Sequence, residues 1–199
     1  MQPLQFLSPD STCLHLVDVQ TGLMRKIVGA GQLASTIAYL INIFKVLGLP
    51  IIANTQYKKG LGGYVPELEP LLDGVPCLDK VEFNAFDNPE TSRLIAAMPQ
   101  VKNWILVGIE THICVYQTAI GALRRGMTPW IVIDGVGSRH DNDRQAGLRR
   151  MEAMGAVLVS SEMVLYELLG RAGTPQFKSL MPLVIERDNQ LASQSVDKA

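Results

Sequence analysis

Short apolar runs alternate with longer segments of helical spacing throughout this 199-residue chain. Six of the short runs are expected to form strands, at 12–19, 49–55, 77–78, 103–108, 128–135 and 156–161. Most are continuous apolar runs, a pattern typical of strands that are buried on both faces. Strands that alternate with helices form parallel sheets covered on both sides. The sequence therefore predicts an α/β fold, a Rossmann-like three-layer α/β/α sandwich with a six-stranded, mainly parallel sheet.

The chain is expected to form one domain over residues 1–185, because 47% of its residues are hydrophobic and single domains of roughly 200 residues are common. The polar stretch from residue 186, ERDNQLASQSVDKA, is expected to be a disordered C-terminal tail. The longest apolar stretch, at 36–53, is interrupted by polar and turn residues. It is therefore expected to form a helix, a turn and a buried strand rather than a membrane span.

Charge and cysteine content argue against several classes of function. The net charge of −1 and the pI near 6.3 give no sign of the clustered Lys and Arg that nucleic acids and anionic membranes attract, so neither is an expected partner. The N-terminus lacks the features of a signal peptide, and we expect a cytoplasmic location. The three cysteines, Cys13, Cys77 and Cys114, form neither a close pair nor an even set, which favours free thiols over disulfides or a zinc site.

Three chemically active side chains follow predicted strands, at the edge of the sheet where such folds bind ligands. Asp18 ends an apolar strand, Lys80 follows the third strand, and Cys114 begins the helix after the fourth. The first turn of a helix favours a thiolate over a thiol. If the three side chains converge, the carboxylate can take the thiol proton while the ammonium stabilises the thiolate. Together they predict a nucleophilic site.

Each of these residues also has a purely structural interpretation. A free cysteine is usually a packing residue, Asp18 can be a cap or half of a buried ion pair, and Lys80 can be an ordinary surface lysine. The histidines are weaker candidates: His15 lies in an apolar strand and is expected to be a core residue, while His112 fits a pocket wall and an outward orientation equally well. Their scattered positions predict no zinc site.

Three segments, LVDVQ, CLDKVEFNAF and VGIETHICVYQTAIGALRRG, resemble the cysteine hydrolases of the isochorismatase-like superfamily in order and spacing. The resemblance spans roughly residues 10–180 and is closest to the isochorismatase-domain-containing branch, whose substrates are poorly defined. It implies that Asp18 is the general base, Lys80 the thiolate-stabilising cation and Cys114 the nucleophile, which forms a thioester with a carboxamide-type carbonyl. It also implies a cis peptide between Ile109 and Glu110, with an oxyanion hole formed by the N–H groups of Glu110 and Cys114.

Departures from the family pattern limit the substrate. Family nicotinamidases often hold a metal with an Asp and histidines in the loop after the second strand, and the corresponding ANTQYKKGLGGYVPE contains no histidine. No metal and no other cofactor is therefore expected. Isochorismatases proper do not need a cysteine at this place, so Cys114 favours an amide or imide substrate. The expected pocket walls are Tyr57, Phe83, Asn84, Phe86 and His112, although Phe83 and Phe86 fit a core position equally well.

The sequence thus predicts a cofactor-independent cysteine hydrolase that cleaves a C–N bond of a small carboxamide or imide. The alternative from another class is a catalytically silent protein of the same fold that binds a partner or acts as a scaffold. A phospho-acceptor receiver domain also has strand-end Asp and Lys, but it fits the length and the cysteine poorly. Because proteins of this family commonly assemble, a homo-oligomer is expected.

Overall fold

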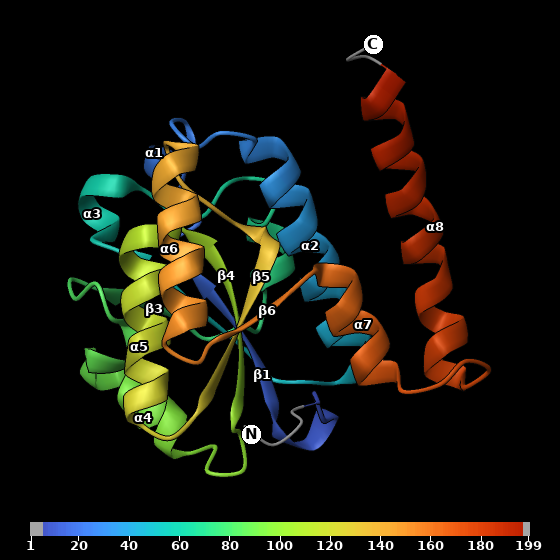
Figure 1. The fold of residues 1–199 in the computed structure, drawn as a ribbon, viewed down its shortest axis with the longest axis horizontal. Helices are drawn as coiled ribbons and strands as arrows, with labels where there is room; N and C mark the ends of the chain where they lie inside the picture. The colour runs from blue at the N-terminus through green and yellow to red at the C-terminus, as the bar shows by residue number, and fades with distance from the viewer. Residues whose placement is uncertain (1–5, 197–199) are drawn as a thin grey trace.

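The computed structural model describes residues 6–196 and contains one six-stranded sheet in which every pair of neighbouring strands is parallel (Figure 1). The strand order is β3-β2-β1-β4-β5-β6. The strands are β1 (Thr12–Val17), β2 (Ile51–Gln56), β3 (Cys77–Lys80), β4 (Asn103–Ile109), β5 (Thr128–Gly137) and β6 (Val157–Val159). The predicted three-layer fold is confirmed.

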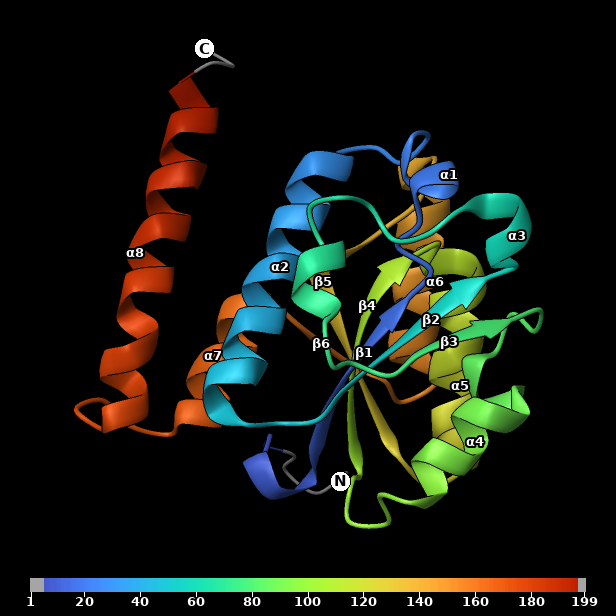
Figure 2. The same cartoon turned by 180° about the vertical axis from the view of Figure 1, so that it is seen from behind.

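Helices cover both faces of the sheet (Figures 1 and 2). One face carries α2 (Ala30–Leu47) and α7 (Ser161–Leu169), with α8 (Pro175–Val196) packed outside α2. The other face carries α4 (Pro89–Ala96), α5 (Tyr116–Arg124) and α6 (Asp141–Ala153). Shorter helices complete the chain: α1 (Thr21–Met24), α3 (Lys58–Leu61), a π-helical turn (Thr111–Val115) and 3-10 turns at Pro9–Ser11, Glu69–Leu72 and Ala85–Asp87.

Alternation along the central strand divides the apolar core into two parts. Leu14 and Leu16 of β1 belong to the cluster under α2, whereas Cys13 and Val17 belong to the cluster on the opposite face. Helix α2 is long and apolar enough to cross a membrane, but half of it is buried inside the protein. It is therefore a core helix, in agreement with the interrupted pattern of its sequence.

The expectation of a disordered tail from residue 186 is wrong for residues 186–196, which continue helix α8; residues 197–199 lie outside the described part. Arg187 supplies the physical reason. One nitrogen of its guanidinium, Nη2, lies 2.9 Å from Asp134 Oδ2, 3.0 Å from Ser161 Oγ and 3.2 Å from Thr36 Oγ1. The guanidinium also stacks over the ring of Tyr39, 4.6 Å from its centroid. One arginine thus connects α8 to α2, β5 and α7, in a segment whose polar composition suggested disorder.

We expect Arg187→Met to lower the free energy of unfolding by about 2 kcal/mol, because charge-assisted hydrogen bonds that are partly buried contribute on that scale. Urea denaturation measures the loss, and hydrogen exchange of residues 180–192 shows whether α8 loosens. Lys178→Met, at an exposed position of the same helix, is the control. Equal stability of the two variants would contradict the role given to Arg187.

Candidate active site

The carboxyl ends of three parallel strands bring Asp18, Lys80 and Cys114 together. Asp18 follows the last residue of β1, Lys80 ends β3, and Cys114 lies in the π-helical turn that follows β4. The Lys80 Nζ reaches past the intervening β2 and lies 2.8 Å from Asp18 Oδ2, and both side chains are fully buried. The convergence on which the predicted nucleophilic site depends is therefore present for the acid and the lysine.

The backbone around Asp18 is shaped to turn its carboxylate inward. Asp18 has a φ of 57°, a left-handed conformation that aspartate adopts more readily than most residues, and its N–H donates to Asn54 O. Next to it, Gly108 of β4 pairs with Val17 and has a φ of 122°. A Cβ at Gly108 would lie 2.0 Å from Val17 O, so only glycine lets β4 approach β1 this closely beneath the site.

All three hydrogen-bond donors of the Lys80 ammonium are matched by acceptors. Asp18 Oδ2 lies at 2.8 Å, Gln56 Oε1 at 2.6 Å and the main-chain carbonyl of Glu82 at 3.1 Å. A lysine has three N–H donors. Lys80 therefore holds Asp18 by direct contact, while its effect on the thiol is exerted through its charge.

The Cys114 side chain is nearly buried, with 6% of its surface exposed, in a turn where Val115 N–H bonds back to Glu110 O in the π-helical pattern. Burial is the largest effect on the thiol and raises its pKa; the negative charge of Asp18 raises it further, and the charge of Lys80 opposes both. The expectation that the helix start favours a thiolate is thus reversed in the resting protein. Nearby polarity does not outweigh the loss of solvent, so the pKa of the thiol lies above its ordinary value.

Asp18 is electrostatically coupled to that thiol. Burial raises the pKa of its carboxyl group, while Lys80 and the Cys114 thiol lower it. Its second oxygen, Oδ1, is buried and has no hydrogen-bond partner among the nitrogen and oxygen atoms of the described residues. A free acceptor oxygen on a carboxylate coupled to a thiol is the arrangement that proton transfer requires.

Glu110 occupies the turn between β4 and Cys114. The peptide bond between Ile109 and Glu110 is cis, at the position that the resemblance implies. The Glu110 side chain points to Arg139, whose Nε and main-chain N–H lie 3.0 Å from the two carboxylate oxygens. Both oxygens of the Glu110 carboxylate are therefore engaged with Arg139. The oxyanion hole formed by the N–H groups of Glu110 and Cys114 remains a prediction.

The structure separates the expected pocket walls into different environments. For Phe86, which fitted a pocket wall and a core position equally well, the structure shows a core environment: it is fully buried, stacked on His15 and edge-on to Trp104. Asn84 is nearly buried; it accepts a hydrogen bond from Phe86 N–H and lies against Gly121 of α5. Tyr57 and Phe83 are each 52% exposed, so these two remain available to a ligand.

Both candidate histidines have structural partners. His15 is a core residue as expected, fully buried, with Nε2 lying 2.6 Å from Asn54 Oδ1. His112 lies beside Ser138, its Nδ1 3.1 Å from Ser138 Oγ, and its backbone packs closely against Gly147 of α6. His112 therefore packs against neighbouring structure, and its role as a pocket wall remains a prediction. Cys13, Cys77 and Cys114 are all free thiols.

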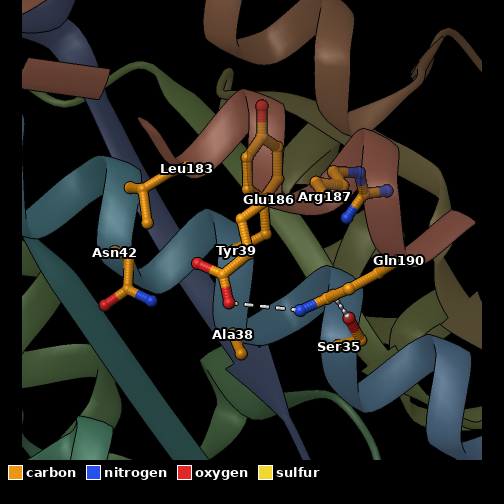
Figure 3. A pocket seen from close by; sticks show the side chains of 8 residues that line it. All are labelled: Ser35, Ala38, Tyr39, Asn42, Leu183, Glu186, Arg187 and Gln190. Carbon is orange, nitrogen blue, oxygen red and sulfur yellow. Dashed lines mark hydrogen bonds between the residues drawn. The ribbon is translucent and has the colours of Figure 1, made fainter. Parts of the chain in front are cut away.

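The cavity shown in Figure 3 lies between α2 and α8 and is lined by none of the three catalytic candidates. Its volume is about 130 Å³, and Tyr39, Glu186 and Arg187 are among the side chains around it. A second cavity of about 270 Å³ lies at the carboxyl end of β5, where Ser138 lines it. Within residues 6–196 there is no cluster of three His, Cys, Asp or Glu side chains that could hold a metal ion.

Comparison with known proteins identifies this site's family. Residues 12–163 match the isochorismatase domain. The chain belongs to the isochorismatase family. Isochorismatase domain-containing protein 2 of Bos taurus is 35% identical over 89% of this chain and 85% of its own length. The solved structure of the MAR1 ribonuclease from Caenorhabditis elegans is 35% identical, covers 91% of this chain and 93% of its own, and superposes with a TM-score of 0.85.

A third relative was solved with a covalent ligand. YcaC from Pseudomonas aeruginosa, in a structure with hexane-2,5-diol and covalent acrylamide, is 25% identical over 96% of both chains, with a TM-score of 0.84. These similarities extend over nearly the whole chain. They support an isochorismatase-family hydrolase.

Two residues of this isochorismatase-family site were missed by sequence reasoning. Gln56 accepts a hydrogen bond from Lys80, and Gln20, which is fully buried, holds the main chain of Gln56. Glutamines carry no charge and form no recognised motif. The one available signal was the position of Gln20, two residues after Asp18 in LVDVQ.

The buried His15 is expected to make the stability of the protein depend on pH. Burial lowers its pKa from the ordinary value of 6.5 to about 4. Between these pH values the unfolded chain binds a proton that the folded chain does not. The stability that neutral, buried His15 contributes is therefore fully present above pH 6.5 and is lost as the pH falls toward 4. We expect a slope of up to about 1.4 kcal/mol per pH unit from this residue.

Urea denaturation between pH 7 and 4 measures that slope. In His15→Gln, which keeps an N–H donor for Asn54, the slope should become shallower than in the native chain. His140→Gln, at an exposed position, should not change it. An unchanged slope in His15→Gln would show that other groups account for the acid sensitivity.

Proposed function

We propose that this protein is a cofactor-independent cysteine hydrolase that cleaves the C–N bond of a small carboxamide or imide through a thioester on Cys114. The observation that carries the proposal is the buried Asp18–Lys80 ion pair, whose carboxylate is electrostatically coupled to the Cys114 thiol. A nucleophile beside a base that a third group holds in place is the usual signature of covalent catalysis.

The first half of the reaction forms the thioester. Asp18 takes the thiol proton as Cys114 Sγ attacks the carbonyl carbon, and the carbonyl oxygen becomes an oxyanion. The intermediate then collapses: the C–N bond breaks, and Asp18 returns its proton to the leaving nitrogen, which departs as ammonia or an amine. The acyl group remains on sulfur, and Asp18 is again a carboxylate.

The second half releases the product. Asp18 takes a proton from a water molecule as the water oxygen attacks the thioester carbon, and collapse of this intermediate breaks the C–S bond. The departing thiolate recovers the proton from Asp18, and a carboxylic acid leaves the site. Cys114 and Asp18 return to their starting protonation states. Each proton that leaves a reacting group is returned within the cycle.

Burial explains why a protonated thiol suits this chemistry. A free thiolate in the resting site would place a second negative charge beside Asp18 in a region without solvent. If the proton passes to Asp18 as the sulfur attacks, the total charge of the site stays constant, with Lys80 balancing a single negative charge throughout. The raised pKa of the thiol is thus compatible with catalysis by a coupled proton transfer.

The relatives support the proposal and define its competitors. Acrylamide is a carboxamide, and its covalent attachment to the P. aeruginosa protein is consistent with a nucleophilic group in a protein of this fold. The C. elegans protein is named a ribonuclease, which makes RNA the natural counter-substrate. A catalytically silent binding protein would keep the fold without turnover.

We expect Cys114→Ser and Cys114→Ala to fold and to lose hydrolysis of the best carboxamide or imide in a small-molecule panel by at least about 10³-fold, since catalytic groups that act as a unit fail together. Product release is followed by chromatography, and the acyl-enzyme by intact-protein mass spectrometry. RNA is assayed beside the panel. Cys13→Ala, at a buried cysteine near the amino end of β1 and so away from the catalytic edge, is the matched control.

Hydrolysis that persists in both Cys114 variants would disprove the proposed mechanism. RNA cleavage without carboxamide hydrolysis would replace the proposed substrate class. No turnover of any substrate, together with a reproducible macromolecular partner, would favour the silent binding protein.

A further inference from the structure

Gln20 fixes the main chain at the end of β2. Its side-chain Oε1 accepts from Gln56 N–H at 2.6 Å, and its Nε2 donates to Gln56 O at 3.1 Å and to Gly62 O at 2.7 Å. Gln20 lies two residues beyond Asp18 and is fully buried. The segment that carries the carboxylate therefore also sets the position of Gln56.

Gln56 in turn holds the end of β3. Its side-chain Oε1 lies 2.6 Å from Lys80 Nζ, and its Nε2 donates to Val81 O at 2.9 Å. Both ends of one amide thus contact the lysine and the residue after it. The Gln20 side chain thus holds the Gln56 main chain, and the Gln56 side chain holds Lys80.

We propose that Gln56 is a positioning residue that directs the Lys80 ammonium toward Asp18 and Cys114. The inference rests on the proposed function, since it assigns to Gln56 a role in the same site. Gln56 acts through Lys80 and takes no proton itself.

The energetics of Lys80 support this role. The lysine is 1% exposed, so solvent does not replace an acceptor that is lost. An ammonium with a buried unpaired donor loses its hydration without a compensating hydrogen bond, which is unfavourable. Without Gln56 Oε1, the ammonium lowers its free energy by moving toward another acceptor. Its position relative to Asp18 is then no longer fixed.

The charges around Cys114 explain why a neutral amide is needed. The groups that act on the thiol are Asp18 from the end of β1, Lys80 from β3 and Glu110 from the end of β4, with Glu110 already paired to Arg139. A carboxylate in place of the Gln56 amide would accept the same hydrogen bond but would divide the lysine charge between two anions. The neutral amide positions the ammonium without competing with Asp18 for its charge.

The test measures the alkylation rate of Cys114 by iodoacetamide against pH, with the modified peptide identified by mass spectrometry so that exposed Cys77 does not interfere. We expect Gln56→Glu to lower the rate at pH 8 about tenfold, which corresponds to a rise of about one unit in the pKa of the thiol. Gln56→Met, which keeps the length and loses both hydrogen bonds, should lower it at least about threefold. Gln176→Met, at an exposed position, is the control.

A double-mutant cycle separates positioning from general structural support. If Gln56 acts through Lys80, Gln56→Met should lower the rate in the native chain and have no effect in the Lys80→Met background. Equal effects in both backgrounds, or no effect of either Gln56 variant while Lys80→Met lowers the rate, would overturn the inference alone. If Lys80→Met and Asp18→Asn also leave the rate unchanged, the catalytic site of the proposed function fails instead.

Discussion

The buried ion pair between Asp18 and Lys80 determines the arrangement of the whole catalytic edge. Neither charge could occupy that position alone, because an unpaired buried charge costs several kcal/mol and the group would lose its ionisation instead. The pair is tolerated because each remaining donor of Lys80 also has an acceptor, from Gln56 and from the carbonyl of Glu82. The strand ends that carry both residues and the left-handed conformation of Asp18 bring them together in a site without solvent.

Burial and the charges of the same pair together determine the pKa of the Cys114 thiol. Solvent would lower the cost of a thiolate, but it would also weaken the attraction between sulfur, carboxylate and ammonium. Burial raises the pKa of the thiol, and in the proposed mechanism the buried Oδ1 of Asp18 takes its proton without a change in the total charge of the site. Exclusion of water and a raised pKa are therefore two consequences of one arrangement.

Sequence reasoning succeeded where one physical rule determines the outcome and failed where several weak effects compete. Buried strands that alternate with helices form a parallel sheet, and parallel strands place their carboxyl ends at one edge, so the meeting of Asp18 and Lys80 was predictable. The direction of Phe86 was not, because an aromatic residue near a site fits a core and a pocket wall equally well. The polar composition after residue 186 suggested disorder, because composition alone does not show that Arg187 binds Asp134. Gln56 was missed because a neutral amide gives no signal until its partners are known.

The hydrogen bonds of the buried residues also indicate where substrate selectivity lies. Lys80 has no donor to spare, Glu110 is paired with Arg139, and Asn84 and Phe86 are engaged with each other, so these buried groups offer little that differs between substrates. Tyr57 and Phe83 each keep about half of their surface exposed to solvent. Both lie near Lys80: Phe83 follows it by three residues, and Tyr57 N–H donates to the main-chain carbonyl of Lys80 at 2.8 Å. The reacting groups are thus held by the core, whereas the exposed aromatic side chains beside them can change without disturbing the ion pair.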